Sequence, residues 1–142
     1  MRYEYRLDLQ VRSYECDIGG VVNNSVYLQY LEHAKCESLK AMNTSYKEMI
    51  NKGASFVVSK LNIDFKYSLK YGDDFWVGVN VRRPSNYHLE GEQDIYRSDG
   101  KLILLSRVVV VCMQQGEFCK LPQQIIDKYP LFVKDEPSIQ NK

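Results

Sequence analysis

The chain has 142 residues and a mass of 16.6 kDa, enough for one ordinary domain and too little for two cores with a linker. Hydrophobic residues make up 44% and charged residues 26%, which excludes a disordered tail and a fibrous repeat. Its 19 basic and 18 acidic residues give a net charge of +1, so we expect no nucleic-acid partner and no attraction to an anionic membrane.

The first predicted element is a strand. Residues 3 to 12 alternate strictly between apolar and polar side chains, a pattern typical of a half-buried strand. The residues expected on its apolar face are Tyr3, Tyr5, Leu7, Leu9 and Val11.

Two helices are expected next. After the turn at Gly19 and Gly20, the segment from about Ser25 to Lys40 has no glycine or proline and repeats apolar residues at helical spacing. A shorter helix is expected over residues 46–51, and it ends before Gly53, a suitable C-terminal cap.

Four further strands are predicted between residues 55 and 113. The first carries Val57, Leu61, Ile63, Phe65 and Tyr67 on one face, and the next carries Phe75, Val77, Val79 and Val81 inward. A third runs over about 87–96, and Asp99-Gly100 marks a tight hairpin into the last, 102–113. The last strand is apolar on both faces, which predicts a central position in the sheet. A short helix is expected over residues 123–129.

This order predicts an α+β fold, with the helices on one face of an antiparallel sheet of about five strands. We expect residues 1–130 to form a single domain and residues 131–142 a C-terminal tail. So short a chain has little left to protect the other sheet face and the edge strands, so pairing with a second copy is expected.

The most informative stretch joins the first strand to the long helix. Asp17 precedes two glycines that permit a sharp turn, while Asn23 and Asn24 stand at the predicted helix start, where N–H groups and the positive dipole end collect. This combination suits acyl-transfer hydrolysis, because the N–H groups stabilise an oxyanion and the carboxylate activates water or attacks directly. From spacing alone, an Asx-type turn and an N-cap are the commoner interpretations.

The sequence gives little support for a metal site or a catalytic thiol. The four cysteines form no Cys-x-x-Cys pair, and His33 and His88 lack ligand spacing, so we expect no metal site. Cys16 is expected to be a buried thiol rather than a nucleophile, since no histidine stands beside it. The charged N-terminal stretch and the lack of a long apolar segment predict no membrane span, and reduced thiols suggest a cytoplasmic location.

The string Asp17-Ile-Gly-Gly20-Val-Val-Asn23-Asn24, with Tyr27, Tyr30 and Glu32 behind it, resembles the signature of hot-dog-fold thioesterases of the 4-hydroxybenzoyl-CoA thioesterase-like branch. The preceding VRSYECD and the later FVVSKLNIDFKYSLKYGDDFWV follow the same pattern, so the resemblance covers roughly residues 3 to 128. It implies a hot-dog fold, in which a curved sheet wraps a long helix. It also implies a hydrolase of acyl-CoA or acyl-carrier-protein (acyl-ACP) thioesters that needs no cofactor or metal and works as a homodimer or homotetramer.

By this resemblance Asp17 is the catalytic carboxylate, and the backbone N–H of Asn24 polarises the thioester carbonyl. Many bacterial acyl-CoA members carry Tyr-His where this chain has Asn23-Asn24, a form closer to plant acyl-ACP thioesterases, so the carrier stays open. The resemblance also gives a set of residues bordering the substrate, the last three expected to approach Asp17 of a partner subunit: Gly20, Val22, Asn23, Tyr27, Val58, Ser59 and Lys60.

Other interpretations stay open beside the thioesterase. One is a non-catalytic hot-dog protein that binds acyl thioesters, and another is a dehydratase, which is weakened because no histidine signature precedes the long helix. Arg82 and Arg83 are candidates for holding CoA phosphates, although a solvated strand end is the commoner role. Acyl length, aromatic preference and the choice between base and nucleophile for Asp17 cannot be read from the sequence.

Overall fold

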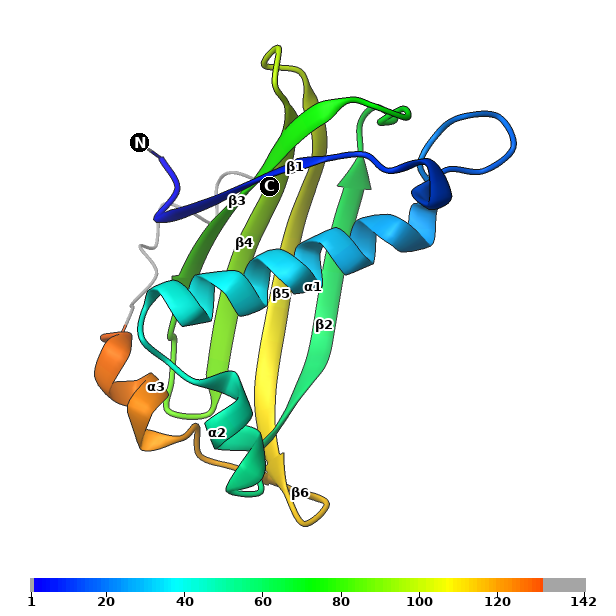
Figure 1. The fold of residues 1–142 in the computed structure, drawn as a ribbon. Helices are drawn as coiled ribbons and strands as arrows, with labels where there is room; N and C mark the ends of the chain where they lie inside the picture. Colours follow the sequence, from blue (N-terminus) through cyan, green and yellow to red (C-terminus); the bar gives the residue numbers. More distant parts are fainter. Residues whose placement is uncertain (1, 132–142) are drawn as a thin grey trace.

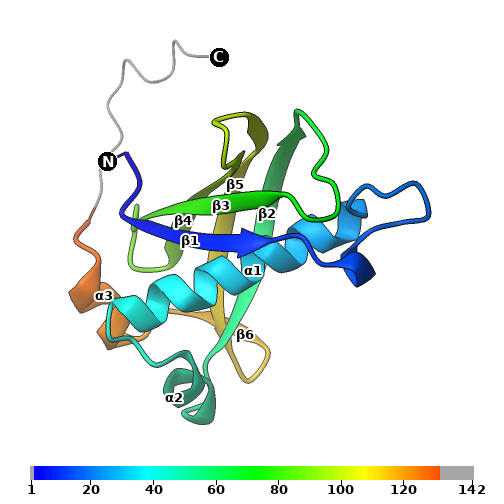
Figure 2. The same cartoon turned by 45° about the horizontal axis from the view of Figure 1, so that its top comes forward.

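One long helix lies across one face of a curved antiparallel sheet that wraps around it (Figures 1 and 2). The structure is a computed structural model and describes residues 2–131. The helices are the 3-10 helix η1 (Ser13–Glu15), α1 (Asn24–Ala41), α2 (Tyr46–Asn51) and α3 (Gln123–Lys128). The strands are β1 (Tyr5–Gln10), β2 (Ser55–Phe65), β3 (Asp74–Arg82), β4 (His88–Arg97), β5 (Leu102–Gln114) and β6 (Glu117–Cys119).

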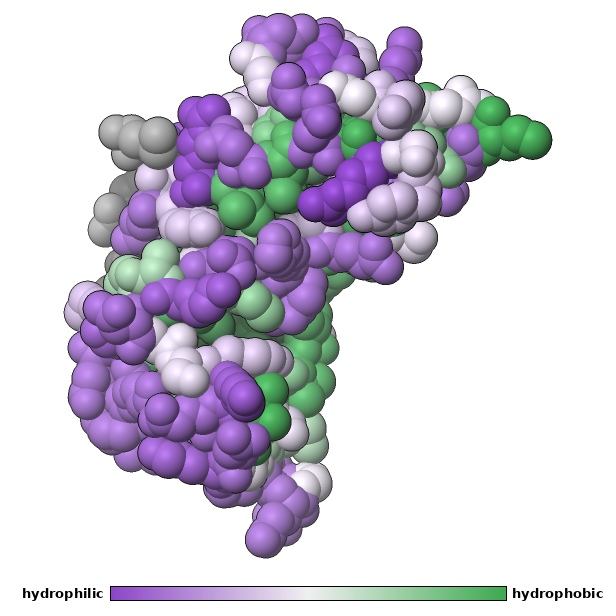
Figure 3. Space-filling model, viewed as in Figure 1, coloured by the Kyte–Doolittle hydropathy of each residue, from purple (hydrophilic) through white to green (hydrophobic). Residues whose placement is uncertain are grey.

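The sheet has six strands in the order β1-β3-β4-β5-β2, with β6 paired to β5. The expected hot-dog architecture is confirmed, although β6 raises the strand number above the predicted five. β5 is interior, between β4 and β2, as its two apolar faces predicted. β2 is an edge strand, yet it exposes several large apolar side chains along the margin of the molecule (Figure 3). These are Val57, Val58, Leu61 and Phe65.

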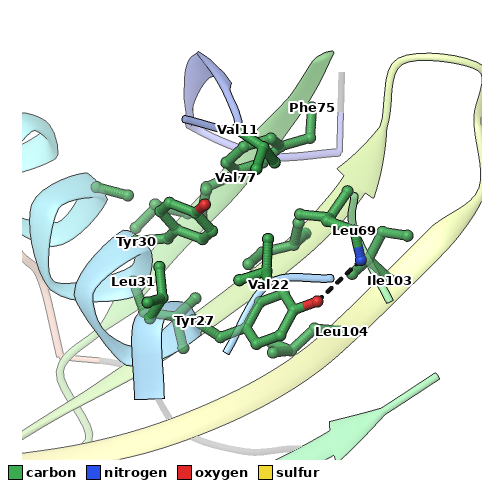
Figure 4. Close-up of a cluster of buried hydrophobic side chains, with 14 residues drawn as sticks. Val11, Val22, Tyr27, Tyr30, Leu31, Leu69, Phe75, Val77, Ile103 and Leu104 are labelled. Carbon is green, nitrogen blue, oxygen red and sulfur yellow. Dashed lines mark hydrogen bonds between the residues drawn. The ribbon is translucent and has the colours of Figure 1, made fainter. Parts of the chain in front are cut away.

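The apolar face of α1 forms the core with the inner face of the sheet (Figure 4). Its buried positions recur at helical spacing, and the helix runs without glycine or proline, as predicted. Each fully buried large side chain contributes about 1.5–3 kcal/mol through removal of apolar surface from water. A polar contact fixes the middle of the helix, because Gln93 of β4 donates its amide to the carbonyl of Leu31 at 2.7 Å.

A buried carboxylate ties the segment before α1 to the helix. Glu15 is 7% exposed, and its Oε1 accepts the Tyr30 hydroxyl at 2.7 Å and the backbone N–H of Arg12 at 2.8 Å. Burial and the neighbouring Glu15 carboxylate raise the pKa of Tyr30, so its hydroxyl stays a donor. The contact sets where the chain enters α1.

Tyr3 does not share the inner face with Tyr5, contrary to the predicted alternation. It precedes β1, and its ring lies against Gly78 on the outer face, where its hydroxyl donates to the buried Asp94. A Cβ on Gly78 would lie 2.5 Å from that ring, so the close approach requires glycine.

The alternation predicted for β2 is also wrong at one point. A bulge at Ser59 leaves Val58 and Lys60 paired with consecutive residues of β5. One extra residue reverses the faces of all side chains beyond it, so Val57 and Leu61 lie on opposite faces rather than together.

The other boundaries agree with expectation within a few residues. α2 has the predicted bounds and is followed by Gly53 at φ +94°, a left-handed cap. Of the expected tail, residues 132–142 lie outside the described part, and Leu131 makes a parallel bridge with Arg83. Between residues 2 and 131 no helix is long and apolar enough to cross a membrane.

We expect Tyr30→Phe to lower the free energy of unfolding by about 1–3 kcal/mol, because the buried Glu15 carboxylate loses a donor. Urea denaturation at fixed protein concentration measures the change. Tyr14→Phe is the matched control, since Tyr14 is 77% exposed and its substitution should change stability by less than about 0.5 kcal/mol. Equal effects of the two substitutions would show that the Tyr30 contact contributes nothing.

Candidate active site

The segment between η1 and α1 folds back on itself as a short hairpin. Cys16 and Val22 face each other in an antiparallel bridge, and the N–H of Asp17 donates to the carbonyl of Val21 at 2.9 Å. The N–H of Gly20 donates to the carbonyl of Asp17 at 3.0 Å, and Gly20 has φ +83°, a left-handed conformation that glycine adopts without steric cost. The turn presents Asp17 at the surface just ahead of α1.

The Asp17 carboxylate is exposed and partly engaged in the turn. Its Oδ1 accepts the N–H of Gly19 at 2.8 Å, so the Asx-type turn considered from the sequence is present. Its Oδ2 makes no hydrogen bond with any residue between 2 and 131. One oxygen therefore sets the direction of the carboxylate, and the other is available to accept a proton.

α1 begins at Asn24 with an unused donor. Asn23 occupies the N-cap position in an extended conformation, but its side chain makes no capping hydrogen bond. Within the described chain, the N–H of Asn24 has no acceptor, as is usual for the first N–H groups of a helix. The helix dipole adds partial positive charge at this end, so a developing anion would be stabilised here.

The remaining residues predicted near Asp17 divide into exposed and buried ones. Gly20 and Asn23 are exposed on the hairpin, whereas Val22 and Tyr27 belong to the core. The N–H of Leu69 donates to the Tyr27 hydroxyl at 2.9 Å (Figure 4), and burial raises the pKa of this tyrosine. Tyr27 thus fixes the helix start against the chain after β2.

The residues predicted on β2 are exposed on the edge strand. Val58, Ser59 and Lys60 lie in the middle of β2, and within residues 2–131 no hydrogen bond or ion pair joins them to Asp17. The Ser59 hydroxyl donates to the carbonyl of Val109 at 3.3 Å.

A groove of about 640 Å³ runs along the exposed side of α1 beside β2. Leu28 of α1 and Val58 and Leu61 of β2 contribute its apolar walls. Glu32 also borders it, but its carboxylate pairs with Lys35 one turn further along α1 at 2.8 Å.

Glu15 is the residue that sequence reasoning missed. Its side chain accepts the backbone N–H of Arg12, and its own carbonyl accepts the N–H of Asn23 at 3.1 Å, so it holds both ends of the hairpin. The residue at the N-cap position of η1 is Arg12, whose side chain has no acceptor, so the Ser or Thr that signals a capping box in a sequence is missing.

Three further residues were considered from the sequence, two arginines as phosphate ligands and one cysteine as a nucleophile. Arg83 is 6% exposed, and its guanidinium donates to the carbonyl of Tyr129 and to Asn86, so it is no surface phosphate ligand. Arg82 pairs with Glu4 at 3.5 Å. Cys16 is half-buried rather than buried. Desolvation, and then the nearby carboxylates, raise the pKa of its thiol, which argues against a thiolate nucleophile.

Known proteins are similar to this chain along most of its length. The chloroplastic acyl-acyl carrier protein thioesterase ATL3 of Arabidopsis thaliana is 25% identical over 137 residues, which cover 95% of this chain and 72% of that protein. The acyl-CoA thioester hydrolase YbgC of Escherichia coli O157:H7 is 24% identical over 127 residues, which cover 88% of this chain and 95% of that protein.

Solved structures share the fold. The 1,4-dihydroxy-2-naphthoyl-CoA thioesterase from Synechocystis superposes with a TM-score of 0.82 at 21% identity, over 87% of this chain and 93% of that one. The expected hot-dog fold and enzyme class, thioester hydrolase, are confirmed by these comparisons. The family model of the thioesterase-like superfamily matches residues 11–129. The chain therefore belongs to the thioesterase-like superfamily.

Proposed function

We propose that the chain hydrolyses acyl-CoA or acyl-ACP thioesters to a free acid and a thiol. One observation carries the proposal: the Asp17 carboxylate, with Oδ2 unbonded, stands on a tight turn just ahead of the unpaired N–H of Asn24. The thioesterase names of both similar proteins support a thioester as substrate, one with an acyl-ACP and one with an acyl-CoA carrier.

In the general-base route, the thioester carbonyl oxygen accepts the N–H of Asn24. Asp17 takes a proton from water as the water oxygen attacks the carbonyl carbon, and the negative charge on the oxygen is stabilised by the start of α1. The intermediate then collapses, the C–S bond breaks, and the departing sulfur takes the proton from Asp17. The carboxylate is regenerated, and one water has been consumed for each acid and thiol formed.

In the nucleophilic route, Asp17 attacks the carbonyl carbon itself and expels the thiolate, and water then cleaves the mixed anhydride. Single-turnover hydrolysis in oxygen-18 water separates the two routes. Label in the Asp17 carboxylate requires the anhydride, because only attack of water on the Asp17 carbonyl of that intermediate places oxygen-18 there.

A second copy is part of the proposal. The unpaired edge of β2 exposes Val58, Leu61 and Phe65, and an edge of this kind invites pairing with another strand. Pairing two such edges would give a homodimer, or a homotetramer by a further contact. Val58, Ser59 and Lys60 of one protomer, exposed on this edge strand, would then line the pocket of the other.

A binding protein without turnover is the second candidate. It is favoured by one observation, the hydrogen bond from Gly19 to Asp17, because this gives the carboxylate a structural role that needs no catalysis. The variants of Asp17 below separate the two candidates.

Asp17→Asn should lower kcat/KM by about 10²- to 10⁴-fold, because the amide oxygen can still accept the N–H of Gly19 while the base is lost. Release of free thiol from acyl-CoA and acyl-ACP substrates measures it. Asp8→Asn is the control, since Asp8 is exposed on β1 and pairs with Arg6. Retention of most wild-type turnover by Asp17→Asn would refute the catalytic role, and thioester binding without hydrolysis by the wild type would favour the binding protein.

Asn24→Pro should lower kcat by about 10²- to 10³-fold, because it removes the proposed oxyanion donor. Proline is tolerated there, since Asn24 is the first helical residue and Asn23 already has φ −61° and ψ 142°. Asn24→Ala keeps the N–H and should retain most activity. Equal losses in the two variants, with unchanged melting temperatures, would argue against the backbone donor.

Light scattering after size-exclusion chromatography should give a mass of two or four times 16.6 kDa. Leu61→Lys should shift the protein toward the single-chain mass, because it places charge at the edge of β2. Phe118→Lys, at a residue 72% exposed on β6, should leave the mass unchanged. A wild-type protein that stays at the single-chain mass at assay concentrations would contradict the proposed pairing.

A further inference from the structure

A narrow cavity lies under the C-terminal half of α1, and the proposed reaction steps do not use it. Its volume is about 40 Å³, room for about three water-sized groups. α1, α2, α3 and four strands of the sheet contribute to its wall, which is apolar along most of its surface. The apolar side chains of that wall include Leu39, Phe56, Val81, Leu89, Val110 and Ile125.

The cavity adjoins the groove along α1. Lys35, Gln93 and Val108 line both, so these three side chains lie between the two hollows beside the middle of the helix. The two hollows together follow α1 from near its start toward its other end. A linear molecule lying in the groove would reach the cavity by passing between these side chains.

Few polar groups face the cavity, whose wall is apolar along most of its surface. Three of its polar side chains also bind elsewhere: the Gln93 amide donates to the carbonyl of Leu31 at 2.7 Å, the Ser38 hydroxyl donates to the carbonyl of Lys35 at 2.8 Å, and the Lys35 ammonium pairs with Glu32. A hydroxylated aromatic group would lose its water contacts in so apolar a hollow, which is costly for a buried hydroxyl. A hydrocarbon chain carries no such cost.

Gly91 borders the cavity on β4, and a Cβ there would lie 2.8 Å from the Val108 side chain. A larger residue at this position would displace Val108, which itself lines the cavity, so the shape of the cavity depends on glycine here.

We propose that this cavity binds the terminal carbons of a long, unbranched aliphatic acyl chain. The inference rests on the proposed thioesterase function and names its substrate class: long-chain aliphatic thioesters, in preference to short-chain and hydroxylated aromatic ones. The reacting carbonyl lies at the start of α1, the chain follows the groove, and its last few methylene groups occupy the cavity.

The length of the helix sets the length of the chain. From Asn24 to the cavity-lining Lys35 and Leu39 the helix rises about 16–22 Å at 1.5 Å per residue. Carbon–carbon bonds of about 1.52 Å at tetrahedral angles advance about 1.25 Å each along an extended chain. An acyl chain of about 12 to 18 carbons therefore spans the distance.

The test is a chain-length profile of kcat/KM on saturated acyl-CoAs from four to eighteen carbons, with 4-hydroxybenzoyl-CoA added. We expect wild-type activity to peak between about 12 and 18 carbons and to exceed that on the aromatic substrate by at least about tenfold. A peak at short chains, or a preference for the aromatic substrate, would overturn the proposal.

Two variants alter the cavity in opposite directions. Val110→Phe fills it and should lower kcat/KM on the sixteen-carbon substrate by about tenfold or more while sparing the eight-carbon one. Val81→Ala enlarges it and should move the optimum to longer chains, which keeps the test usable if the larger side chain prevents folding. Val109→Phe is the matched control, because Val109 is the neighbour on β5 that points to the other face of the sheet. Unchanged profiles in both cavity variants would refute the assignment.

A binding experiment tests the cavity even if the protein hydrolyses no thioester. If the wild type hydrolyses none of the thioesters, titration with palmitic acid still tests the cavity by calorimetry. Binding that Val110→Phe weakens about tenfold and Val109→Phe leaves unchanged would support the cavity as an acyl site in a protein that is no hydrolase. Absence of binding, or equal binding by all three proteins, would refute the cavity assignment itself.

Discussion

The packing of α1 across the inner face of the sheet is the constraint on which the rest of the structure depends. Its 18 residues extend about 27 Å, so one rigid element spans most of the sheet. Two polar contacts fix it within that apolar packing: Gln93 of β4 binds the carbonyl of Leu31, and Tyr30 binds the buried Glu15. Because the second contact also anchors η1, the position of the helix and the position of the hairpin that carries Asp17 are set together.

This arrangement gives the two ends of one helix different chemistry. The start of α1 offers an N–H and a positive dipole end, and the hairpin that leads into it carries an exposed carboxylate; both are suited to charge that develops during a reaction. The other half of the helix covers a cavity lined mainly by apolar side chains. Because the helix is rigid, the distance between its start and the cavity is constant. In the proposed enzyme this distance sets the length of the acyl chain that fits. The open edge of β2 leaves the groove between these ends uncovered in a single protomer.

Sequence patterns predicted the helices and strands well where apolar residues recurred at a regular spacing. The inward residues of β3, the extent of α1 and the bounds of α2 follow directly from period and capping signals. The pattern failed where a long-range contact outweighed it. Tyr3 crosses to the outer face because Gly78 leaves room for its ring and Asp94 accepts its hydroxyl. In β2 a bulge reverses the faces, and no residue type at Ser59 announces it. Arg83 was expected at a solvated strand end, yet it is buried and donates to the carbonyl of Tyr129.

By itself the sequence determined the element order and the local chemistry of the hairpin, because turns, helix starts and strand periods depend on residues close together in the chain. Asp17, the glycines after it and Asn24 were identified in this way. The family was indicated by the resemblance of the string around Asp17 to its signature. Only the tertiary structure decided that Glu15 anchors the hairpin, that Tyr27 supports the core, and that Val58, Ser59 and Lys60 are exposed on an edge strand. It alone also revealed the cavity beneath α1, since a space enclosed by residues from Lys35 to Ile125 depends on packing between distant segments. No local pattern records such packing.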